Sequence, residues 1–258
     1  MTADLGTEPA SVLGIPEGTR ALLFDLDGVI TKTAVIHAAA WKEMFDAFLR
    51  DRAAASGEPF VPFDDGADYD AYVDGRPRAD GVRTFLASRG ITLPEGEPDD
   101  APDAATVNGL GNRKNAIVLD LIERRGVEPY AGSVRYLHAA RAAGLRIAVV
   151  SSSANCLAVL RSAGIEDLFD ARVDGVVARE RSLPGKPAPD TFLEGARELG
   201  ATPADAVVYE DALAGVEAGR AGGFSLVVGL DRVGQADALR AHGADIVVSD
   251  LDQLLESP

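Results

Sequence analysis

The sequence predicts an α/β protein: a parallel β-sheet core with a helical cap domain inserted after the first strand. From about residue 144 onward, short apolar and β-branched runs alternate with helical patterns, which is typical of parallel strands joined by helices. One more run of this kind lies near the N-terminus, and a stretch with helical periodicity separates it from the others. We therefore expect an interrupted core.

Five segments are the expected strands. Most are apolar throughout, as strands covered by helices on both faces should be. The expected strands are residues 21–24, 145–150, 206–209, 225–230 and 245–248.

The insert begins with a pattern of apolar residues at helical spacing, which fall on one face of a helix and predict a long helix there. The residues of this face are Ala34, Ala38, Trp41, Phe45 and Phe48. Almost no strand-like run follows before residue 128. We expect residues 1–32 and 129–258 to form the core and residues 33–128 the cap.

Two acidic segments rich in glycine and proline, residues 51–70 and 94–103, interrupt the insert. Such composition is typical of surface loops. Gly90 is suited to end the helix that precedes the second segment.

Composition and charge restrict the possible partners. The chain has 258 residues with 41 acidic and 25 basic side chains, a formal net charge of −16. Because this charge repels polyanions, and because no Lys/Arg-rich run interrupts it, we expect no nucleic-acid and no membrane-surface partner. No uncharged apolar run approaches the ~18 to 20 residues that a membrane-spanning helix needs.

The expected location is the cytoplasm. The first twenty residues are acidic and contain no apolar run, so we expect no secretory signal. The single cysteine, Cys156, agrees with a reducing compartment, and we expect it to be a buried helix residue. The sequence leaves the oligomeric state open and is compatible with a monomer.

Asp25 and Asp27 directly follow the first expected strand. Ligands gather at the carboxyl ends of parallel strands, and Gly28 permits a bend that turns both carboxylates toward one cleft. Such a pair suits a hard cation, or a nucleophile beside an acid/base group. Taken alone, the motif fits a solvated acidic turn equally well, and it is a poor match to a calcium-binding EF-hand loop.

Three further polar segments favour a functional site over a solvated turn. Ser151 opens a run of hydroxyls after the strand 145–150, where a helix begins and an anion binds well. Lys186 stands in a proline-rich loop before a helix, and Glu210 and Asp211 follow the strand 206–209. Together these segments place an acid pair, a hydroxyl, a lysine and a second acid pair in the order that one cleft requires.

In these four motifs the chain resembles the haloacid dehalogenase-type phosphotransferases. Asp25 to Val29 matches the first motif, Ser151 the second, Lys186 the third and Glu210-Asp211 the fourth. The resemblance spans the core and implies a doubly wound, Rossmann-like parallel sheet. The helical insert between the first two motifs resembles the cap of the beta-phosphoglucomutase-like subgroup.

The resemblance implies a role for each core residue. Asp25 would be the nucleophile that forms an aspartyl-phosphate, and Asp27 the general acid and base. Ser151 and Lys186 would hold the transferring phosphate oxygens. The cofactor would be Mg²⁺, which prefers oxygen ligands. Its expected ligands are Asp25, Glu210, Asp211 and the backbone carbonyl of Asp27.

The resemblance extends into the cap. Thr33, His37 and Trp41 follow the subgroup in spacing, and His37 would couple cap closure to Asp27. Arg78 matches an arginine that binds the non-transferring phosphate, and Lys114 matches a lysine that faces the sugar. By composition alone, a solvated basic turn is the alternative for both cations. The candidate substrate-binding residues, including two further ones after Ser151, are Thr33, His37, Trp41, Arg78, Lys114, Ser152 and Asn155.

The chain also departs from the subgroup. Lys32 replaces the acidic residue that often follows the first motif, the cap loops are longer, and Pro77 precedes Arg78 where serine is common. The reaction class is therefore better defined than the substrate.

The activity that the resemblance implies is that of a Mg²⁺-dependent hexose phosphate mutase, acting on a small phosphorylated sugar. It would interconvert β-glucose 1-phosphate and glucose 6-phosphate through a bisphosphate. A sugar-phosphate phosphatase shares every core residue and is the first alternative. A non-catalytic sugar-phosphate sensor is the second.

Overall fold

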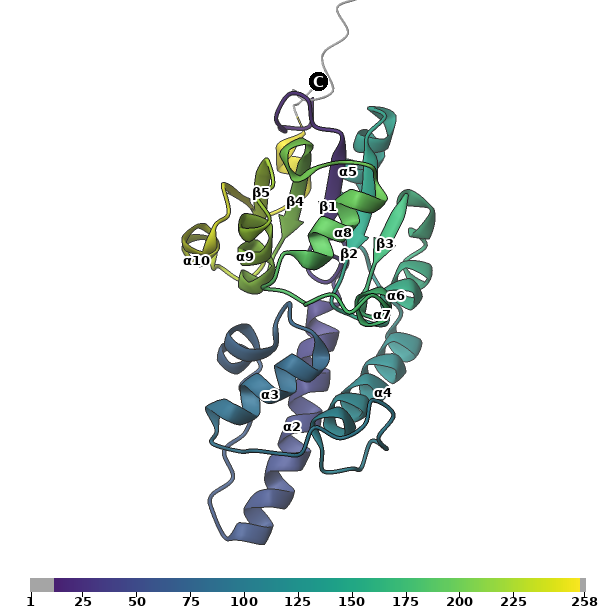
Figure 1. Cartoon of the computed structure of the whole chain (residues 1–258). Helices are drawn as coiled ribbons and strands as arrows, with labels where there is room; N and C mark the ends of the chain where they lie inside the picture. Colours follow the sequence, from purple (N-terminus) through teal and green to yellow (C-terminus); the bar gives the residue numbers. More distant parts are fainter. Residues whose placement is uncertain (1–11, 256–258) are drawn as a thin grey trace, which may run out of the picture.

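The computed structural model describes residues 12–255, which form a sheet-containing core and a separate helical layer (Figure 1). Six strands make one sheet in the order β3-β2-β1-β4-β5-β6, and all neighbouring strands run parallel. The strands are β1 (Ala21–Phe24), β2 (Arg146–Val150), β3 (Ala171–Val173), β4 (Ala206–Glu210), β5 (Leu226–Leu230) and β6 (Ile246–Val248). The predicted parallel α/β core is confirmed.

Successive side chains of each strand enter different hydrophobic clusters, because strand side chains alternate between the two faces of a sheet. In β1, Leu22 and Phe24 join a cluster that includes Tyr136 of helix α5 (Ala131–Ala142), whereas Leu23 joins one that includes Phe192 of helix α8 (Asp190–Glu198). All of these side chains are buried. Both faces of the sheet are therefore covered, as a doubly wound fold requires.

Short helices connect the strands. The carboxyl ends of β1, β2 and β4 face the helical layer (Figure 1). The α-helices of the core are α5 (Ala131–Ala142), α6 (Cys156–Ser162), α7 (Gly175–Glu180), α8 (Asp190–Glu198), α9 (Leu213–Ala221) and α10 (Ala236–His242). Short 3₁₀ turns are η2 (Glu166–Leu168), η3 (Pro203–Asp205) and η4 (Leu251–Leu254).

One strand was not predicted from the sequence. β3 has three residues, lies at the edge of the sheet and carries Arg172 in its centre. Because an edge strand this short contributes little apolar surface, it lacks the continuous hydrophobic run by which the other strands were recognised.

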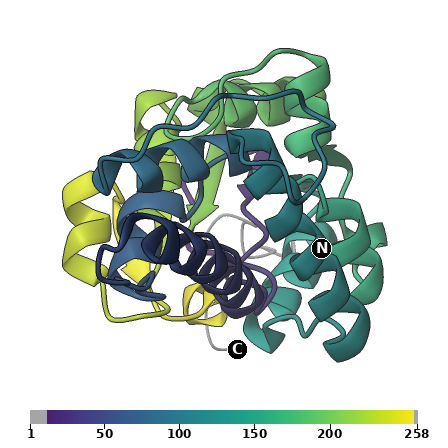
Figure 2. The same ribbon diagram turned by 90° about the horizontal axis from the view of Figure 1, so that it is seen from below.

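The insert between β1 and α5 is helical, as predicted. Figure 2 shows it from below, with the long helix α2 in front of the core. Its elements are α2 (Ala34–Ser56), a π-helix η1 (Tyr69–Val73), α3 (Arg78–Ser88) and α4 (Val107–Arg125).

The insert has a hydrophobic cluster of its own. Phe45 is completely buried there, with ring centroids 5.2 Å from Trp41 and 4.2 Å from Phe85. Ala38 and Phe48, predicted for the same helix face, are only partly buried against this cluster. The division into a core of residues 1–32 and 129–258 and a cap of residues 33–128 stays a prediction, which this separate cluster supports.

The first predicted loop starts too early. α2 continues through residues 51–56, because Ala53, Ala54 and Ala55 are strong helix formers, and it ends at Gly57 with φ 74°. The π-helix η1 occupies the other end of the segment. Residues 94–103 contain no helix or strand, and Gly90 has φ 66° directly after α3, both as predicted.

Three expectations about the environment of the chain meet different outcomes. Cys156 is completely buried in α6, as predicted. Among residues 12–255, no helix combines the length and apolarity needed to cross a bilayer. Residues 1–11, on which the expected absence of a secretory signal partly depends, lie outside the described part of the chain.

Candidate active site

The candidate site lies where the strand order reverses. β1 pairs with β2 on one side and with β4 on the other, so loops leaving β1 diverge from those of its neighbour and open a crevice. The backbone N–H of Asp25 donates to Tyr209 O at 2.9 Å, which extends the pairing and brings Asp25 beside Glu210. The two predicted acid pairs therefore meet at one edge of the sheet.

Lys186 connects these two acid groups. Its ammonium donates to Asp25 Oδ1 and to Glu210 Oε1, both at 2.6 Å, and to Val150 O at 3.2 Å. Burial disfavours the ammonium, but Asp25 and Glu210 outweigh that effect and raise the pKa of Lys186. The lysine is thus a fixed positive charge beneath the site.

Asp25, Glu210 and Asp211 form a compact cluster of buried carboxylates, with one oxygen of each within 4.8 Å of the others. Burial raises the pKa of Asp25 and of Asp211 well above the usual range, and neighbouring carboxylates raise them further; Lys186 opposes the effect on Asp25. One ammonium does not balance this negative charge. The all-oxygen donor set and its uncompensated charge fit a hard divalent cation such as Mg²⁺.

Gly28 makes this cluster possible. Its φ is +87°, and a Cβ atom at this position would lie 1.7 Å from Asp211 Oδ2. The bend expected after the first acid pair is therefore present, and a larger residue would displace Asp211.

Asp27 points away from the cluster toward the first helix of the insert. Its Oδ1 accepts a hydrogen bond from the Thr33 hydroxyl and lies 3.5 Å from His37 Nε2. Burial, followed by the positive charge of Lys114, lowers the pKa of His37 to about 4. The imidazole is therefore neutral at physiological pH, and its Nε2 has no hydrogen-bond partner among residues 12–255.

Lys114 lies on the other side of His37. Its Nζ is 2.7 Å from His37 Nδ1 and 4.7 Å from the centroid of the Trp41 ring. Burial lowers the pKa of Lys114 to about 7; Asp27 opposes this effect and Arg78 adds to it. The amine is buried and half-protonated near neutral pH, which suits it to gain charge when an anion approaches.

The loop after β2 joins the two layers. The Ser151 hydroxyl is buried and accepts from Ser153 N at 3.1 Å. Ser152 Oγ donates to Gly75 O at 2.7 Å, and Asn155 Nδ2 donates to Asn115 Oδ1 at 2.9 Å. Ser152 and Asn155, two of the candidate substrate-binding residues, thus hydrogen-bond to residues of the insert.

A cavity of about 620 Å³ separates the insert from the core at this point. Three predicted residues do not line the cavity but hydrogen-bond to residues that do; they are Thr33, Lys186 and Glu210. Arg78 reaches it from the start of α3, where its Nη2 donates to Asn112 Oδ1 at 3.0 Å. The predicted residues that line the cavity are Asp25, Asp27, His37, Trp41, Arg78, Lys114, Ser151, Ser152, Asn155 and Asp211.

The cavity also contains residues that sequence reasoning did not single out. Asp74 lines it, and burial together with Glu210 raises the pKa of Asp74 to about 7. Asn115 and Arg179 line it as well. Asp74 is one of many acidic residues and Arg179 one of many arginines, so only the folded arrangement distinguishes them.

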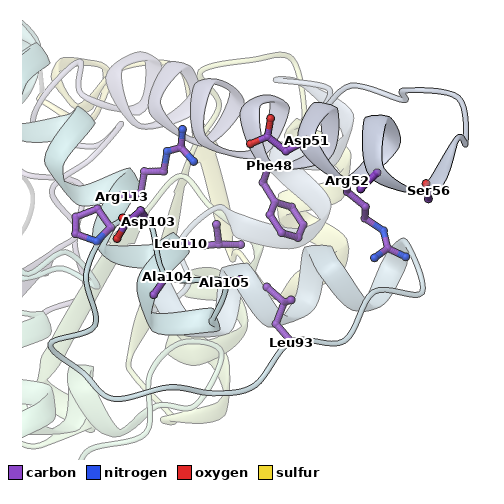
Figure 3. A pocket seen from close by; sticks show the side chains of 12 residues that line it. Phe48, Asp51, Arg52, Ser56, Leu93, Asp103, Ala104, Ala105, Leu110 and Arg113 are labelled. Carbon is purple, nitrogen blue, oxygen red and sulfur yellow. The ribbon is translucent and has the colours of Figure 1, made fainter.

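A second hollow, of about 490 Å³, lies in the insert between α2, the start of α4 and the segment before it. Figure 3 shows Phe48, Leu93 and Leu110 on its walls, with Asp103 and Arg113 nearby. None of the predicted site residues lines it. The predicted site residues therefore lie at or directly behind the cavity between insert and core.

Comparison with known proteins identifies the family. A model of the haloacid dehalogenase-like hydrolases matches residues 19–223. The chain belongs to this family. It is 58% identical over 247 residues to proteins named beta-phosphoglucomutase from Mycobacterium bovis and Mycobacterium tuberculosis, which covers 95% of this chain and 94% of each relative.

More distant members of the family share the whole fold. A Bacillus subtilis protein named beta-phosphoglucomutase is 32% identical and covers 91% of both chains. The crystal structure of beta-phosphoglucomutase from Clostridium difficile superimposes with a TM-score of 0.72 and 26% identity, over 92% of this chain and 93% of that one. The predicted family and the doubly wound core are thereby confirmed, and the chain is an enzyme.

Proposed function

We propose that the protein is a Mg²⁺-dependent β-phosphoglucomutase that converts β-glucose 1-phosphate to glucose 6-phosphate. The observation that carries this proposal is that one cavity has a phosphoryl-transfer centre, Asp25 with Lys186, on its core side and the cations Arg78 and Lys114 on its insert side. A mutase must hold both phosphates of a bisphosphate, whereas a phosphatase needs a site for one.

Asp25 is suited to be the nucleophile. Lys186 holds its Oδ1 at 2.6 Å, which leaves Oδ2 to attack phosphorus while the bond from phosphorus to the departing oxygen breaks. The product is an aspartyl-phosphate. Asp25, Glu210, Asp211 and the backbone carbonyl of Asp27 would hold Mg²⁺, which would supply the positive charge that lets a carboxylate approach a phosphate.

Lys186 and Ser151 hold the transferring oxygens. Both side chains are buried, and Lys186 contacts Asp25 from behind the cavity wall, so the ammonium and hydroxyl act with little screening by water. Their positions are fixed by Glu210 and by the loop after β2.

Asp27 is suited to move the proton. It gives a proton to the departing oxygen and later takes one from the attacking sugar hydroxyl. The hydrogen bond from Thr33 and the proximity of His37 fix its orientation. Thr33 and His37 lie at the start of the insert, so a movement of the insert would also move Asp27.

The insert shields the site from water. Ser152 and Asn155 hydrogen-bond across the junction, and these contacts hold the insert against the core. Closure delays hydrolysis of an aspartyl-phosphate until a sugar phosphate arrives. Since the substrate is a metabolite of the cell interior, we place the enzyme in the cytoplasm.

One assay tests the proposal. The protein is incubated with Mg²⁺, β-glucose 1-phosphate and a trace of glucose 1,6-bisphosphate, and glucose 6-phosphate and free phosphate are quantified. We expect isomer without stoichiometric phosphate release. Phosphate release without isomer would instead identify a sugar-phosphate phosphatase, and binding with neither product would identify a sensor.

A further inference from the structure

Three arginines that line the cavity have no carboxylate partner among residues 12–255. They are Arg76, Arg78 and Arg179, and the single side-chain hydrogen bond from any of them goes to the neutral amide of Asn112. Arg83, which also lines the cavity, is by contrast held by Glu95 at 2.7 Å. In a chain with a net charge of −16, unpaired guanidinium groups around one cavity indicate a site for an anion.

Two of these arginines come from opposite sides of the junction. Arg78 is the first residue of α3 in the insert, whereas Arg179 lies in α7, at the edge of the core that faces the insert (Figure 1). They are close enough that, after burial, the charge of Arg179 is the next cause of a lowered pKa of Arg78. Closure of the insert therefore brings two like charges together.

Arg179 is the positive side chain that the core contributes to the described cavity wall. Lys186 lies behind that wall, and the loop from Ser151 to Asn155 contains no charged residue. Arg179 itself is exposed at the rim, so it can reach a ligand without first breaking an ion pair.

We propose that Arg179 is a substrate-binding residue that, together with Arg78, holds the non-transferring phosphate of the sugar bisphosphate. This inference rests on the proposed mutase function. A dianionic phosphate between the two guanidinium groups would replace their repulsion with two charge-assisted contacts, and it would join insert to core. Binding of the second phosphate and closure would then be one event.

The test compares affinities for glucose 1,6-bisphosphate by calorimetry in the presence of Mg²⁺. Every protein carries Asp25→Asn, so that the ligand is bound and not consumed. A charge-assisted hydrogen bond contributes about 1.5–3 kcal/mol, so we expect Arg179→Gln to weaken binding on the order of 10- to 100-fold. Arg179→Lys should recover part of the loss, since it keeps the charge and loses the fork.

The matched control is Arg181→Gln. Arg181 follows in the same segment and does not line the cavity; it pairs with Glu198 at 2.6 Å. We expect this variant to bind the bisphosphate within about two-fold of the parent, because the change in net charge is the same and only the position differs.

A double-mutant cycle tests whether the two arginines hold the same group. If they do, the double variant Arg78→Gln, Arg179→Gln should lose less affinity for glucose 1,6-bisphosphate than the product of the two single losses. The reason is that a phosphate already loosened by one substitution is held less firmly by the remaining arginine. Losses that multiply would contradict a shared phosphate.

The outcomes separate this inference from the proposed function. If the parent binds the bisphosphate and Arg179→Gln binds equally well, the role of Arg179 is wrong and the mutase proposal stands. If the parent binds no bisphosphate and the unsubstituted enzyme forms no glucose 6-phosphate, both proposals are wrong.

Discussion

Burial sets the charge of the side chains around the cavity. Lys186 stays protonated because two carboxylates contact it. Lys114 instead contacts a neutral imidazole and the Trp41 ring, and burial lowers its pKa to about 7. Two lysines of the same intrinsic basicity thus serve different purposes. In the proposed mechanism, Lys186 is a constant counter-charge for the nucleophile, and Lys114 responds to the ligand.

Replacement of the nucleophile should abolish the reaction. Asp25→Asn keeps the shape of the side chain and its contact with Lys186, but an amide cannot form an aspartyl-phosphate. We expect the rate of glucose 6-phosphate formation to fall by about 10⁴-fold or more, by analogy with the loss of other covalent nucleophiles. The thermal unfolding midpoint serves as a control for folding; a rate within ten-fold of the wild type would refute the assignment.

Lys114 should make substrate binding depend on pH. The folded pKa of about 7 lies below the usual 10.5, so the charged form that attracts a phosphate is lost as the pH rises through 7. We expect the Kd for glucose 1,6-bisphosphate to increase between pH 6.5 and 8.5 by up to about ten-fold per pH unit. Lys114→Met should bind weakly with a flat profile, and an unchanged slope in that variant would assign the effect to another group.

The loop after β2 performs two structural tasks. Its backbone leads into α6, and its side chains reach the insert at Gly75 and Asn115. Such contacts are neutral hydrogen bonds, each contributing about 1 kcal/mol. They are strong enough to favour closure and weak enough to release a product.

Removal of one of these hydrogen bonds should increase hydrolysis of the aspartyl-phosphate by water. Ser152→Ala deletes the hydrogen bond to Gly75 O, so the closed population should fall several-fold and more aspartyl-phosphate should be hydrolysed. We expect the ratio of free phosphate to glucose 6-phosphate to rise about three- to ten-fold.

Ser225→Ala is the matched control for this effect. It deletes a bond of equal length, 2.7 Å, from a half-buried serine to Ala206 O in the core. Equal ratios in the two variants would show that closure does not govern this hydrolysis.

The whole chain carries an excess of negative charge, and its most crowded part is the buried cluster of Asp25, Glu210 and Asp211. Folding must bring these carboxylates together against their repulsion and away from water. The folded protein therefore has less stability at neutral pH than its hydrophobic core alone would provide.

This charge predicts a pH-dependent stability that Mg²⁺ should remove. Because the folded pKa values of Asp25 and Asp211 lie above the unfolded value near 3.8, the folded state binds more protons and the free energy of unfolding falls as pH rises above about 4. We expect the thermal unfolding midpoint with EDTA to drop by several degrees from pH 5 to 8, and Mg²⁺ to restore most of it.

Asp211→Asn provides the comparison. It removes one charge from the cluster, so the drop with EDTA should shrink and the gain from Mg²⁺ should become smaller. An equal gain in this variant would place the cation elsewhere. Activity should disappear with EDTA in the wild type and return when Mg²⁺ is added.

The sequence alone predicted the parallel core, the helical insert after the first strand and the core residues of the proposed site. Continuous apolar runs mark strands that are covered on both faces, and Asp25, Ser151, Lys186 and Glu210 each follow such a run or precede a helix. Local pattern is sufficient here because the ends of parallel strands share one edge. The pattern failed for β3, which is short and at the edge, and for the end of α2, where alanines continue the helix past residue 51, the expected start of a loop.

Only the tertiary structure decided which polar residues meet across the junction. Ser152 and Asn155 bind the insert, Asp74 and Arg179 enter the cavity, and Lys114 contacts His37 from 77 positions away in the chain. Asp74 and Arg179 carry no local signal, and the contacts of Ser152, Asn155 and Lys114 are not encoded along the chain, because they depend on the distance and burial that two separately packed layers impose on each other. The same burial sets the charge of Lys114, which no spacing along the chain encodes.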